Sequence, residues 1–561
     1  MCRTKTRVAL LGWTAFVVAV ACASLARSEE AAYDLVLRGG RIVDGSGNPW
    51  FYGDVAIRGD RIVAIGRVPV AAALREIDAR GLIVAPGFID IHSHSDYVLL
   101  EDGRALSKIH QGVTTEVLGE GTSAAPVKGK FAARGASTAS GAPQWATLGE
   151  YFHALEQGQT SVNVATYVGL DNLWEAVMGT SHARPTSAQR EEMKALLDEA
   201  LADGAFGLST MLAMPPGSLT TTDDLVDLCQ VVARHGGIYS SHIRNEGTGV
   251  RAAVEEAISI GERARVPVDI IHLKIADEKL WGRMGELVAL IDAARERGVN
   301  VQAHVYPYTR GSNDLASIIP PWGHEGGTAK MLERLADATQ RAALERDIEQ
   351  GLDGWYNHYT AVGRDWSRML VAGKGPYEGL TMDRVIALET QKRPREPLDV
   401  LFDLLIESGG SIPTVYAHHT ESDMRLALVQ PWCSVGSDGS ALAVTGPLKR
   451  GNPHPRSFGT FPRVLGVYVR DDQTLRLEDA VRKMTSLNAS KIGLRDRGLL
   501  RLGAFADLTL FAPDRVRDQA TYTAPFAYNE GIEYVIVNGV VVLAKGEHTG
   551  AKPGRVLRRG T

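Results

Sequence analysis

The chain has 561 residues, of which 44% are hydrophobic and 23% charged, and this composition excludes both a disordered polymer and a small disulfide-stapled scaffold. Its 61 Lys and Arg against 66 Asp and Glu leave a formal net charge of −5, and no basic run stands out, so no nucleic-acid partner is expected. Four cysteines are too few for a disulfide framework, and we interpret Cys229 and Cys433 as buried thiols.

Residues 1–28 have the pattern of a secretory signal peptide. Three basic residues precede an apolar stretch over residues 8–22, and small residues follow it. This stretch of about 15 residues is shorter than the roughly 20 that a membrane-spanning helix needs, and no later segment is long enough. We therefore predict an exported, periplasmic protein with no stable membrane insertion after cleavage. A lipid anchor on Cys22 is an alternative to simple release.

Short alternating runs closed by Gly, Asp or Asn follow over residues 29–85, as in DLVLRGGRIVDGSG and GDVAIRGDRIVAIG. Val and Ile favour strands and Gly supplies the turns, so the pattern predicts a small antiparallel sheet. A matching pattern returns over residues 491–561, in GAFADLTLFAP and YVIVNGVVVLAKGE. Because neither fragment can bury a face alone, we predict that the two ends of the chain pair into one discontinuous β-domain.

Between these ends, over residues 86–490, apolar strand-like runs alternate with helical segments such as SAQREEMKALLDEALAD and TGVRAAVEEAISIGERAR. Repeated β-then-α units predict a parallel sheet, and about eight of them predict a closed (β/α)8 TIM-like barrel, so the fold class is α/β. The strand-like runs are GLIVAPGFIDIHSH, GVTTEVLGEG, SVNVATYVGL, GAFGLST, GGIYSSHI, PVDIIHLK, NVQAHVYPY, TVYAHH and CSVGSDG.

The alternation is interrupted at about residues 311–411. This region is richer in charge and contains PPWGHEGG and GWYNHYTAVGRDW. We predict that it is an insertion over the mouth of the barrel.

Histidines stand at the ends of several strand-like runs. His92 and His94 end a strand in GFIDIHSHSD, and residues two apart on a strand point to the same side. His242 in YSSHIRNEG and His272 in DIIHLKIAD end later strands, and Asp438 in SVGSDGSA follows another. The carboxyl ends of barrel strands meet at one rim, so these side chains are expected to converge. Zinc binds imidazole nitrogen and carboxylate oxygen, and the sequence therefore predicts a metal centre.

The order HxH, His, His, Asp around a barrel resembles the amidohydrolase superfamily. More narrowly, the chain is similar to the N-acyl-D-amino-acid deacylases, also called D-aminoacylases, from about Tyr33 to the C-terminal strands. Seven fragments in the same order carry the resemblance: APGFIDIHSHSD, GVTTEVLGEG, SHIRNEG, HLKIAD, VYPYTRGS, GSDGSA and HPRSFGTFPRVLG.

This resemblance implies a role for each matching position. His92 and His94 would hold one metal position, and His242 and His272 the neighbouring, tighter one. The cofactor would be zinc, as one or two ions, with other divalent metals as alternatives. Asp438 would be the catalytic carboxylate. The positions that match the family's grip on the substrate carboxylate are Lys274, Tyr306 and Ser312.

The chain departs from the family in the loop after the GVTT strand. D-aminoacylases generally carry a metal-bridging or metal-binding Cys there, whereas this chain reads GVTTEVLGEGTSAAP. Glu120 is the nearest candidate, because a carboxylate can bridge hard-to-borderline cations. Strict alternation, however, places Gly121 rather than Glu120 on the face of that Cys. A bulge or loop at the strand end is therefore needed if Glu120 is to bind metal.

Other polar residues have structural interpretations beside functional ones. His304 in VQAHVYPY is interpreted as a barrel-wall residue rather than a ligand. His418 and His419 follow an apolar run, and adjacent residues of a strand cannot both face inward. The segment after His242, with Arg244, Asn245 and Glu246, is equally compatible with substrate contact and with capping of the next helix.

The resulting prediction is a metal-dependent hydrolase that cleaves N-acyl-D-amino acids to a carboxylate and a free D-amino acid. The metal would lower the pKa of a bound water from ~15.7 toward ~7, and Asp438 would pass its proton to the departing amine. The D preference follows from the resemblance alone, and the oligomeric state is left open. Three alternatives remain: a cyclic amidohydrolase of the dihydroorotase or hydantoinase type, a dipeptidase, and a non-catalytic barrel that binds ligands. Against the cyclic substrate stand the insertion and the set Lys274, Tyr306 and Ser312.

Overall fold

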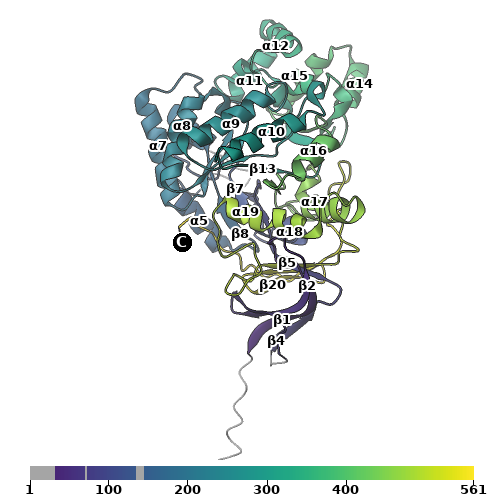
Figure 1. Cartoon of the computed structure of the whole chain (residues 1–561). Coiled ribbons are helices and arrows are strands. Elements are labelled where there is room, and N and C mark those ends of the chain that lie inside the picture. The colour runs from purple at the N-terminus through teal and green to yellow at the C-terminus, as the bar shows by residue number, and fades with distance from the viewer. Residues whose placement is uncertain (1–31, 70–72, 134–143, 561) are drawn as a thin grey trace, which may run out of the picture.

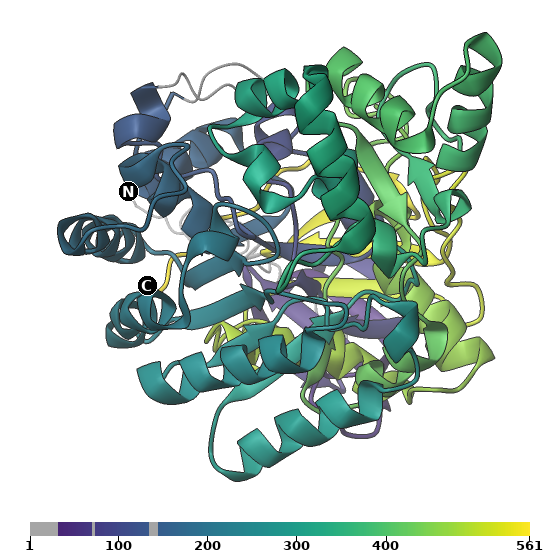
Figure 2. The ribbon, with the colours of Figure 1, turned by 90° about the horizontal axis from the view of Figure 1, so that it is seen from above.

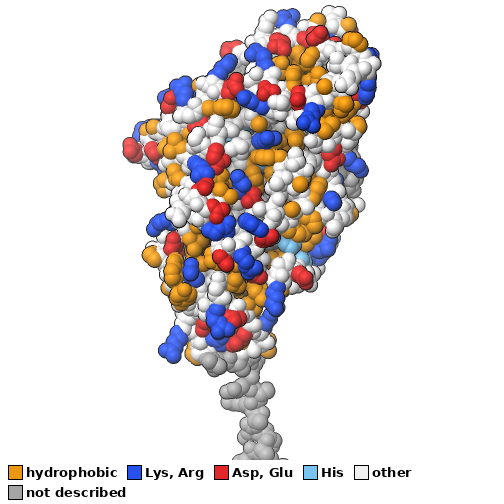
Figure 3. All heavy atoms as spheres, turned by 90° about the vertical axis from the view of Figure 1, so that its right-hand side faces the viewer, with side chains coloured by type: hydrophobic (Ala, Val, Ile, Leu, Met, Phe, Trp, Pro, Cys, Tyr) orange, Lys and Arg blue, Asp and Glu red, His pale blue; other side chains and the backbone are white. Residues whose placement is uncertain are grey.

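The computed structural model describes residues 32–69, 73–133 and 144–560. A β-domain lies at one end of the molecule and a helix-covered barrel lies above it (Figure 1). The predicted signal peptide, residues 1–28 with Cys22, lies outside the described residues. Among the residues described, no helix is both long enough and apolar enough to cross a membrane. Acidic and basic side chains are interspersed over the face in Figure 3.

The β-domain is one sheet built from both ends of the chain, as the sequence predicts. Within the described residues its strand order is β21-β20-β19-β18-β5-β1-β2-β3, and β4 pairs with β1. The two ends meet where β5 and β18 run antiparallel with Val84 opposite Leu510. The strands are β1 (Tyr33–Ile42), β2 (Phe51–Arg58), β3 (Arg61–Gly66), β4 (Ala73–Asp78), β5 (Ile83–Pro86), β18 (Leu508–Phe511), β19 (Ile532–Val537), β20 (Val540–Ala544) and β21 (Glu547–His548).

The barrel is a closed ring of parallel strands, which confirms the predicted fold class. In the described part of the chain two parallel sheets, β6-β7-β8 and β9-β10-β11-β12-β13-β17, form the ring. Only Tyr167 separates β8 from β9, and a parallel bridge between Ser93 and Gly439 joins the two outer strands. The strands are β6 (Phe88–Asp90), β7 (Val113–Leu118), β8 (Asn163–Thr166), β9 (Val168–Gly169), β10 (Gly207–Met211), β11 (Ile238–His242), β12 (Val268–Ile270), β13 (Val301–Val305) and β17 (Cys433–Val435).

Amphipathic helices surround this ring (Figure 2). Local sequence explains where several of them begin: Thr147, Thr186 and Thr221 each form a capping box with the residue three positions later. The helices are α2 (Val98–Glu101), α3 (Leu106–His110), α4 (Gly129–Ala133), α5 (Leu148–Gly158), α6 (Leu170–Met178), α7 (Ser187–Ala202), α8 (Thr222–Arg234), α9 (Val250–Ala264), α10 (Met284–Glu296), α16 (Glu421–Leu428), α17 (Arg456–Arg463) with its π-helical continuation (Val464–Asp471), α18 (Leu477–Met484) and α19 (Ser486–Lys491).

The insertion has its own small sheet and apolar core, and it lies at the end of the barrel away from the β-domain (Figure 1). Its strands are β14 (Gly311–Asp314), β15 (Met369–Val371) and β16 (Pro413–Tyr416), and its helices are α11 (Thr328–Ala336), α12 (Ala338–Gln350), α13 (His358–Ala361), α14 (Met382–Lys392) and α15 (Pro397–Glu407).

One predicted barrel strand is wrong. The run TVYAHH contains β16, which pairs antiparallel with β14 and β15 and so belongs to the sheet of the insertion. Val415 lies opposite both Ser312 and Leu370. A short apolar run has the same appearance in any buried strand, and only its pairing partners decide which sheet it joins. The other strand-like runs supply the ring of the barrel.

Candidate metal centre and active site

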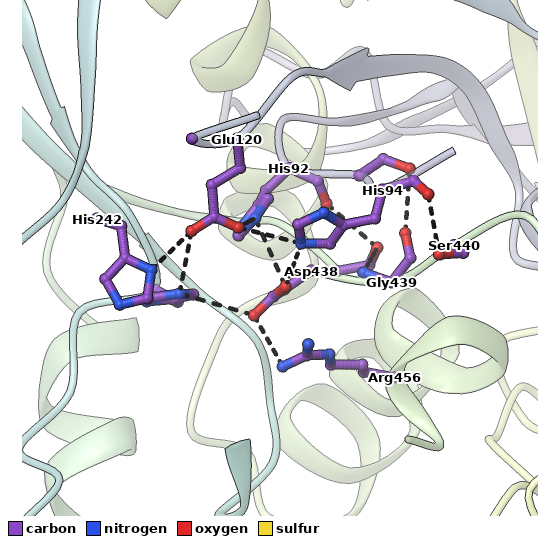
Figure 4. A network of polar contacts seen from close by, with 12 residues as sticks. His92, His94, Glu120, His242, Asp438, Gly439, Ser440 and Arg456 are labelled. Atoms are coloured by element: carbon purple, nitrogen blue, oxygen red, sulfur yellow. Dashed lines mark hydrogen bonds and ion pairs between the residues drawn. The ribbon is translucent and has the colours of Figure 1, made fainter. Parts of the chain in front are cut away.

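His92 and His94 lie just beyond the end of β6 and face the same point (Figure 4). The Nε2 atom of His92 lies 2.7 Å from Oε2 of Glu120, and the Nε2 atom of His94 lies 3.1 Å from the same oxygen. His94 Nε2 also lies 2.9 Å from Oδ1 of Asp438. The spacing of two residues therefore directs both imidazoles toward a pair of carboxylates.

Glu120 connects this group of ligands to a second one. Its Oε1 atom lies 2.8 Å from Nδ1 of His242 and 3.7 Å from Nε2 of His272, while its Oε2 atom faces His92 and His94. Burial acts to raise the pKa of Glu120, but the surrounding imidazoles, His92 first among them, hold it well below its ordinary value. The side chain is therefore an anion whose two oxygens face two sets of histidines.

The backbone after β7 explains how Glu120 reaches this place. The strand ends at Leu118, and Gly119 and Gly121, with φ of +89° and +61°, turn the chain on either side of Glu120. Both angles lie in the left-handed region that glycine adopts without strain. Strand alternation no longer applies beyond Leu118, so the Glu120 side chain can point into the barrel.

His242 and His272 form the second group. His242 ends β11, and His272 follows β12 with a φ of +36°, so that the two rings lie with their centres 4.5 Å apart. The Nδ1 atom of His272 lies 3.1 Å from Oε1 of Glu246, which leaves Nε2 directed toward Glu120. Burial lowers the pKa of His272 to about 3, so its imidazole is neutral at pH 7, as a metal ligand must be.

Asp438 lies between the two groups. It follows β17 with a φ of +53°, and its backbone N–H donates a hydrogen bond to the His92 carbonyl at 2.8 Å. Its Oδ2 atom lies 2.7 Å from the Arg456 guanidinium and 3.8 Å from Nε2 of His272. Burial acts to raise the pKa of Asp438, but Arg456 and the histidines hold it well below its ordinary value. The carboxylate is therefore ionised at the junction of the two groups.

The donor set fits one or two divalent ions. In each of two groups, ligand atoms from every member lie within 4.8 Å of one another, and Glu120 belongs to both groups. Imidazole nitrogen and carboxylate oxygen are donors that zinc accepts. The groups are His92, His94, Glu120 and Asp438, and Glu120, His242 and His272.

A cavity of about 660 Å³ lies beside these ligands, and its volume is in the size range of small-molecule sites. Ser312, on β14 of the insertion, lines this cavity together with His94 and Asp438. The Tyr306 ring lies 6.0 Å from the His272 ring, and its buried hydroxyl has no hydrogen-bond partner among the described residues. The ammonium of Lys274 lies 5.9 Å from the Tyr306 ring centre and pairs with Glu246 at 2.5 Å.

Arg456 is a site residue that the sequence analysis did not single out. It begins α17, its guanidinium carbon lies 5.0 Å from the Tyr306 ring centre, and its buried Nε has no hydrogen-bond partner in the described structure. The fragment HPRSFGTFPRVLG contains it, but an arginine at a helix start has no spacing signal that links it to a distant aspartate. The contact with Asp438 depends on the tertiary fold.

In the segment after His242, Arg244 and Asn245 have structural roles, whereas Glu246 faces the site. Asn245 accepts hydrogen bonds from the backbone N–H groups of Gly247 and Gly249, and Arg244 pairs with Glu256 at 2.9 Å. Glu246 instead faces the site, where it contacts His272 and Lys274.

His418 and His419 are both buried, with their Nδ1 atoms 3.0 Å apart. They follow β16 of the insertion, not a barrel strand, so the alternation argument made for them from the sequence does not apply.

Comparisons with known proteins agree with this geometry. A sequence model of the "Amidohydrolase family" (Amidohydro_3) matches residues 75–543 of the chain. The chain is 37% identical to an N-acyl-D-glutamate deacylase and 36% identical to a D-aminoacylase, both from Alcaligenes xylosoxydans xylosoxydans; the matches cover 94% and 95% of this chain and 96% and 99% of the relatives. A crystal structure of N-acyl-D-glutamate deacylase from Bordetella bronchiseptica, complexed with zinc and a phosphonate mimic of the tetrahedral intermediate, is 34% identical with a TM-score of 0.77, over 94% of this chain and 99% of that one.

Proposed function

Because the chain belongs to the amidohydrolase family, and within it to the D-aminoacylases, we propose that it hydrolyses the amide bond of N-acyl-D-amino acids. The products are a carboxylate and a free D-amino acid. The observation that carries the proposal is the convergence of four histidines and two carboxylates, from the ends of different barrel strands, in two adjacent groups that share Glu120. The names of the relatives support the D configuration, and the cavity of about 660 Å³ has room for a small acylated amino acid.

We propose zinc as the cofactor, as one or two ions. His92 and His94 would hold one position, His242 and His272 the other, and Glu120 would bridge them. When bound, zinc supplies Lewis acidity, which polarises a carbonyl group and favours ionisation of water at neutral pH.

Asp438 is the proposed carrier of the proton in this reaction. Its carboxylate is ionised, lies beside both histidine groups and lines the substrate cavity. It can accept a proton from the attacking water and then donate that proton to the departing amine nitrogen. Arg456, at 2.7 Å, holds the carboxylate in place through this cycle.

Lys274, Tyr306 and Ser312 are proposed to orient the substrate through its carboxylate. The buried Tyr306 hydroxyl has no partner in the described structure, and a buried polar group without a partner is costly unless a ligand satisfies it. Lys274 lies next to Tyr306, and the Glu246 carboxylate balances the positive charge of its ammonium group. Lys274 would therefore act on the substrate mainly as a hydrogen-bond donor.

The test is hydrolysis of matched pairs of N-acetyl-D- and N-acetyl-L-amino acids, combined with metal analysis of the purified protein. We expect zinc in the protein and turnover of the D series alone. Turnover of the L series alone would overturn the proposed substrate class. A metal-free, inactive protein would favour a ligand-binding barrel without catalysis.

Asp438→Asn tests the proposed proton carrier. Asn retains the size of the side chain but cannot accept and return the proton, so kcat should fall by ~10²–10⁴. Metal content should be retained, because His92, His94, His242, His272 and Glu120 all remain. Stopped-time assays of amine release with metal analysis measure both, and Asp353→Asn, at an exposed residue, is the control. An unchanged kcat would exclude this role for Asp438.

The location of the protein is a separate proposal that rests on residues 1–28 alone. We propose export to the periplasm with removal of this segment, and lipid attachment at Cys22 as the alternative form. Mass spectrometry of the N-terminal peptide of the mature protein distinguishes a free terminus, a lipidated Cys22 and an uncleaved chain.

A further inference from the structure

His92 is the first member of a buried chain of polar contacts that leads away from the proposed metal centre. Its Nδ1 atom lies 3.1 Å from Nε2 of His304, and Nδ1 of His304 lies 2.8 Å from Oδ2 of Asp269. The other oxygen of Asp269 accepts a hydrogen bond of 2.5 Å from the Lys491 ammonium. All four residues are buried, with at most 5% of any of them exposed.

These four residues come from separate parts of the barrel. His304 lies on β13, Asp269 on the adjacent strand β12, and Lys491 ends α19. Lys491 also donates a hydrogen bond of 2.8 Å to the Ala303 carbonyl on β13. The contacts therefore connect the proposed ligand to a helix that precedes the C-terminal part of the β-domain.

The hydrogen positions in this series of contacts can be assigned by starting from Lys491 and Asp269. Burial acts to raise the pKa of Asp269, but Lys491 and His304 outweigh that effect and lower it to about 2. Asp269 is therefore an acceptor only, and Nδ1 of His304 must donate to it. Because Nδ1 of His304 donates to Asp269, a His304 ring with one N–H has its acceptor lone pair on Nε2, the atom that lies 3.1 Å from Nδ1 of His92.

The same assignment passes on to His92. Because His304 Nε2 is an acceptor, His92 Nδ1 must donate to it, and the lone pair of a neutral His92 is then on Nε2. That atom lies 2.7 Å from Oε2 of Glu120 and 3.5 Å from Oδ1 of Asp438. A lone pair directed at two carboxylates needs a proton or a metal ion between them, and this series of contacts makes Nε2 the nitrogen of His92 that is free to bind a metal.

We propose that His304 and Asp269 are positioning residues that fix the tautomer and ring orientation of His92, with Lys491 balancing the charge of Asp269. This inference rests on the proposed metal centre. The other metal position has a different support, because the Glu246 carboxylate lies 3.1 Å from Nδ1 of His272. The side-chain contacts of His304 therefore bear on the position that His92 would hold.

The test is metal binding by His304→Phe, measured on the full-length folded protein by zinc competition with a chromogenic chelator and by the visible spectrum of bound Co²⁺. Phe retains the ring and removes both nitrogens. We expect 10- to 100-fold weaker binding at one position, the range seen when an outer partner of a metal-bound histidine is lost. The His92→Ala variant gives the reference binding isotherm of a protein that lacks the metal position of His92.

A conservative variant and a double variant separate positioning from a general packing effect. His304→Gln can place an amide oxygen near the lost Nε2, so it should recover part of the affinity. His304→Phe in the His92→Ala background should cause no further loss. The control is His235→Phe. His235 also pairs with an aspartate, Asp198, at 2.9 Å, but it lies outside the metal-binding groups. Zinc binding by this variant should match that of the wild type.

The outcomes are distinct. An unchanged isotherm for His304→Phe, with clear loss in His92→Ala, overturns the positioning role and leaves the metal centre intact. An equal loss in the presence and absence of His92 also overturns it, because the effect would not pass through His92. A wild-type protein that binds neither zinc nor Co²⁺ overturns the proposed metal centre itself.

Discussion

Glu120 shows how much one side chain contributes to the centre. Its two oxygens face four histidines, and it is the one residue shared by the two ligand groups of the described structure. A carboxylate in this place is a harder donor than a thiolate, and it suits borderline and hard divalent ions alike. The identity of this residue therefore bears on which metals the centre accepts.

Replacing Glu120 by Gln should weaken metal binding at both positions. Gln retains the size of the side chain but loses the negative charge and one acceptor oxygen. At zinc 100-fold above its Kd, the wild-type protein should gain about 2.7 kcal/mol of stability by linkage, and the variant should gain clearly less. The rise in Tm on adding zinc to chelator-treated protein measures this. Glu191→Gln, at a residue with 71% of its side chain exposed, is the control, and an equal rise in all three proteins would argue against Glu120 as a ligand.

At the scale of an element, the turn after β7 positions Glu120. Gly121 has a φ of +61°, and a Cβ atom there would lie 2.6 Å from the Cβ of Met211 on β10. The turn therefore needs glycine for two reasons, the backbone angle and the close approach of a neighbouring strand. Gly59 has a similar φ of +57° but nothing within 4 Å of its Cβ position. A substitution at Gly59 therefore measures the effect of the backbone angle alone.

Gly121→Ala should destabilise the protein more than Gly59→Ala and should also weaken metal binding. Gly59→Ala should lower the free energy of unfolding by about 1 kcal/mol, from backbone strain alone. The Gly121 change adds a steric overlap that moves the turn carrying Glu120. Thermal midpoints and zinc isotherms of the two variants give both comparisons. Equal midpoints, or normal zinc binding in Gly121→Ala, would contradict this account of the turn.

Elements were predicted well where their signal is local. The helical periodicity of the segments that form α7 and α9 is a property of short windows, and both helices lie where this pattern indicates. The strand β16 has an equally clear apolar pattern, yet it was assigned to the wrong sheet. Hydrophobicity identifies a buried strand, but the choice of neighbours depends on residues far away in the chain.

At the scale of the whole molecule, buried charges connect the barrel to the segments that follow it. Asp269 on β12 and Lys491 at the end of α19 are 222 positions apart and form an ion pair with neither side chain exposed. The pKa of Asp269 is lowered to about 2, below its ordinary value of 3.8. A lowered pKa contributes stability above the ordinary pKa, and this contribution is lost as the pH falls toward about 2.

The pH dependence of stability should therefore change when this pair is removed. The shift corresponds to about 2 kcal/mol at pH 7, of which about 1 kcal/mol should be lost by pH 3. The double variant Asp269→Asn/Lys491→Met leaves no unpaired charge, and its Tm should fall less between pH 5 and pH 3 than that of the wild type. Calorimetry on metal-free samples at one scan rate measures this. Parallel declines would show that the pair has no such effect.

The sequence by itself determined the alternation of strands and helices, the pairing of the chain ends into one sheet, and the placement of His92, His94, His242, His272 and Asp438 at strand ends. These follow from periods of two and 3.6 residues and from the shared rim of a barrel, which local patterns reveal. The tertiary structure alone decided the direction of Glu120, the contact of Arg456 with Asp438, and the link from His92 to His304, 212 residues away. Such contacts depend on three-dimensional closure of the barrel, and no pattern within one segment encodes them.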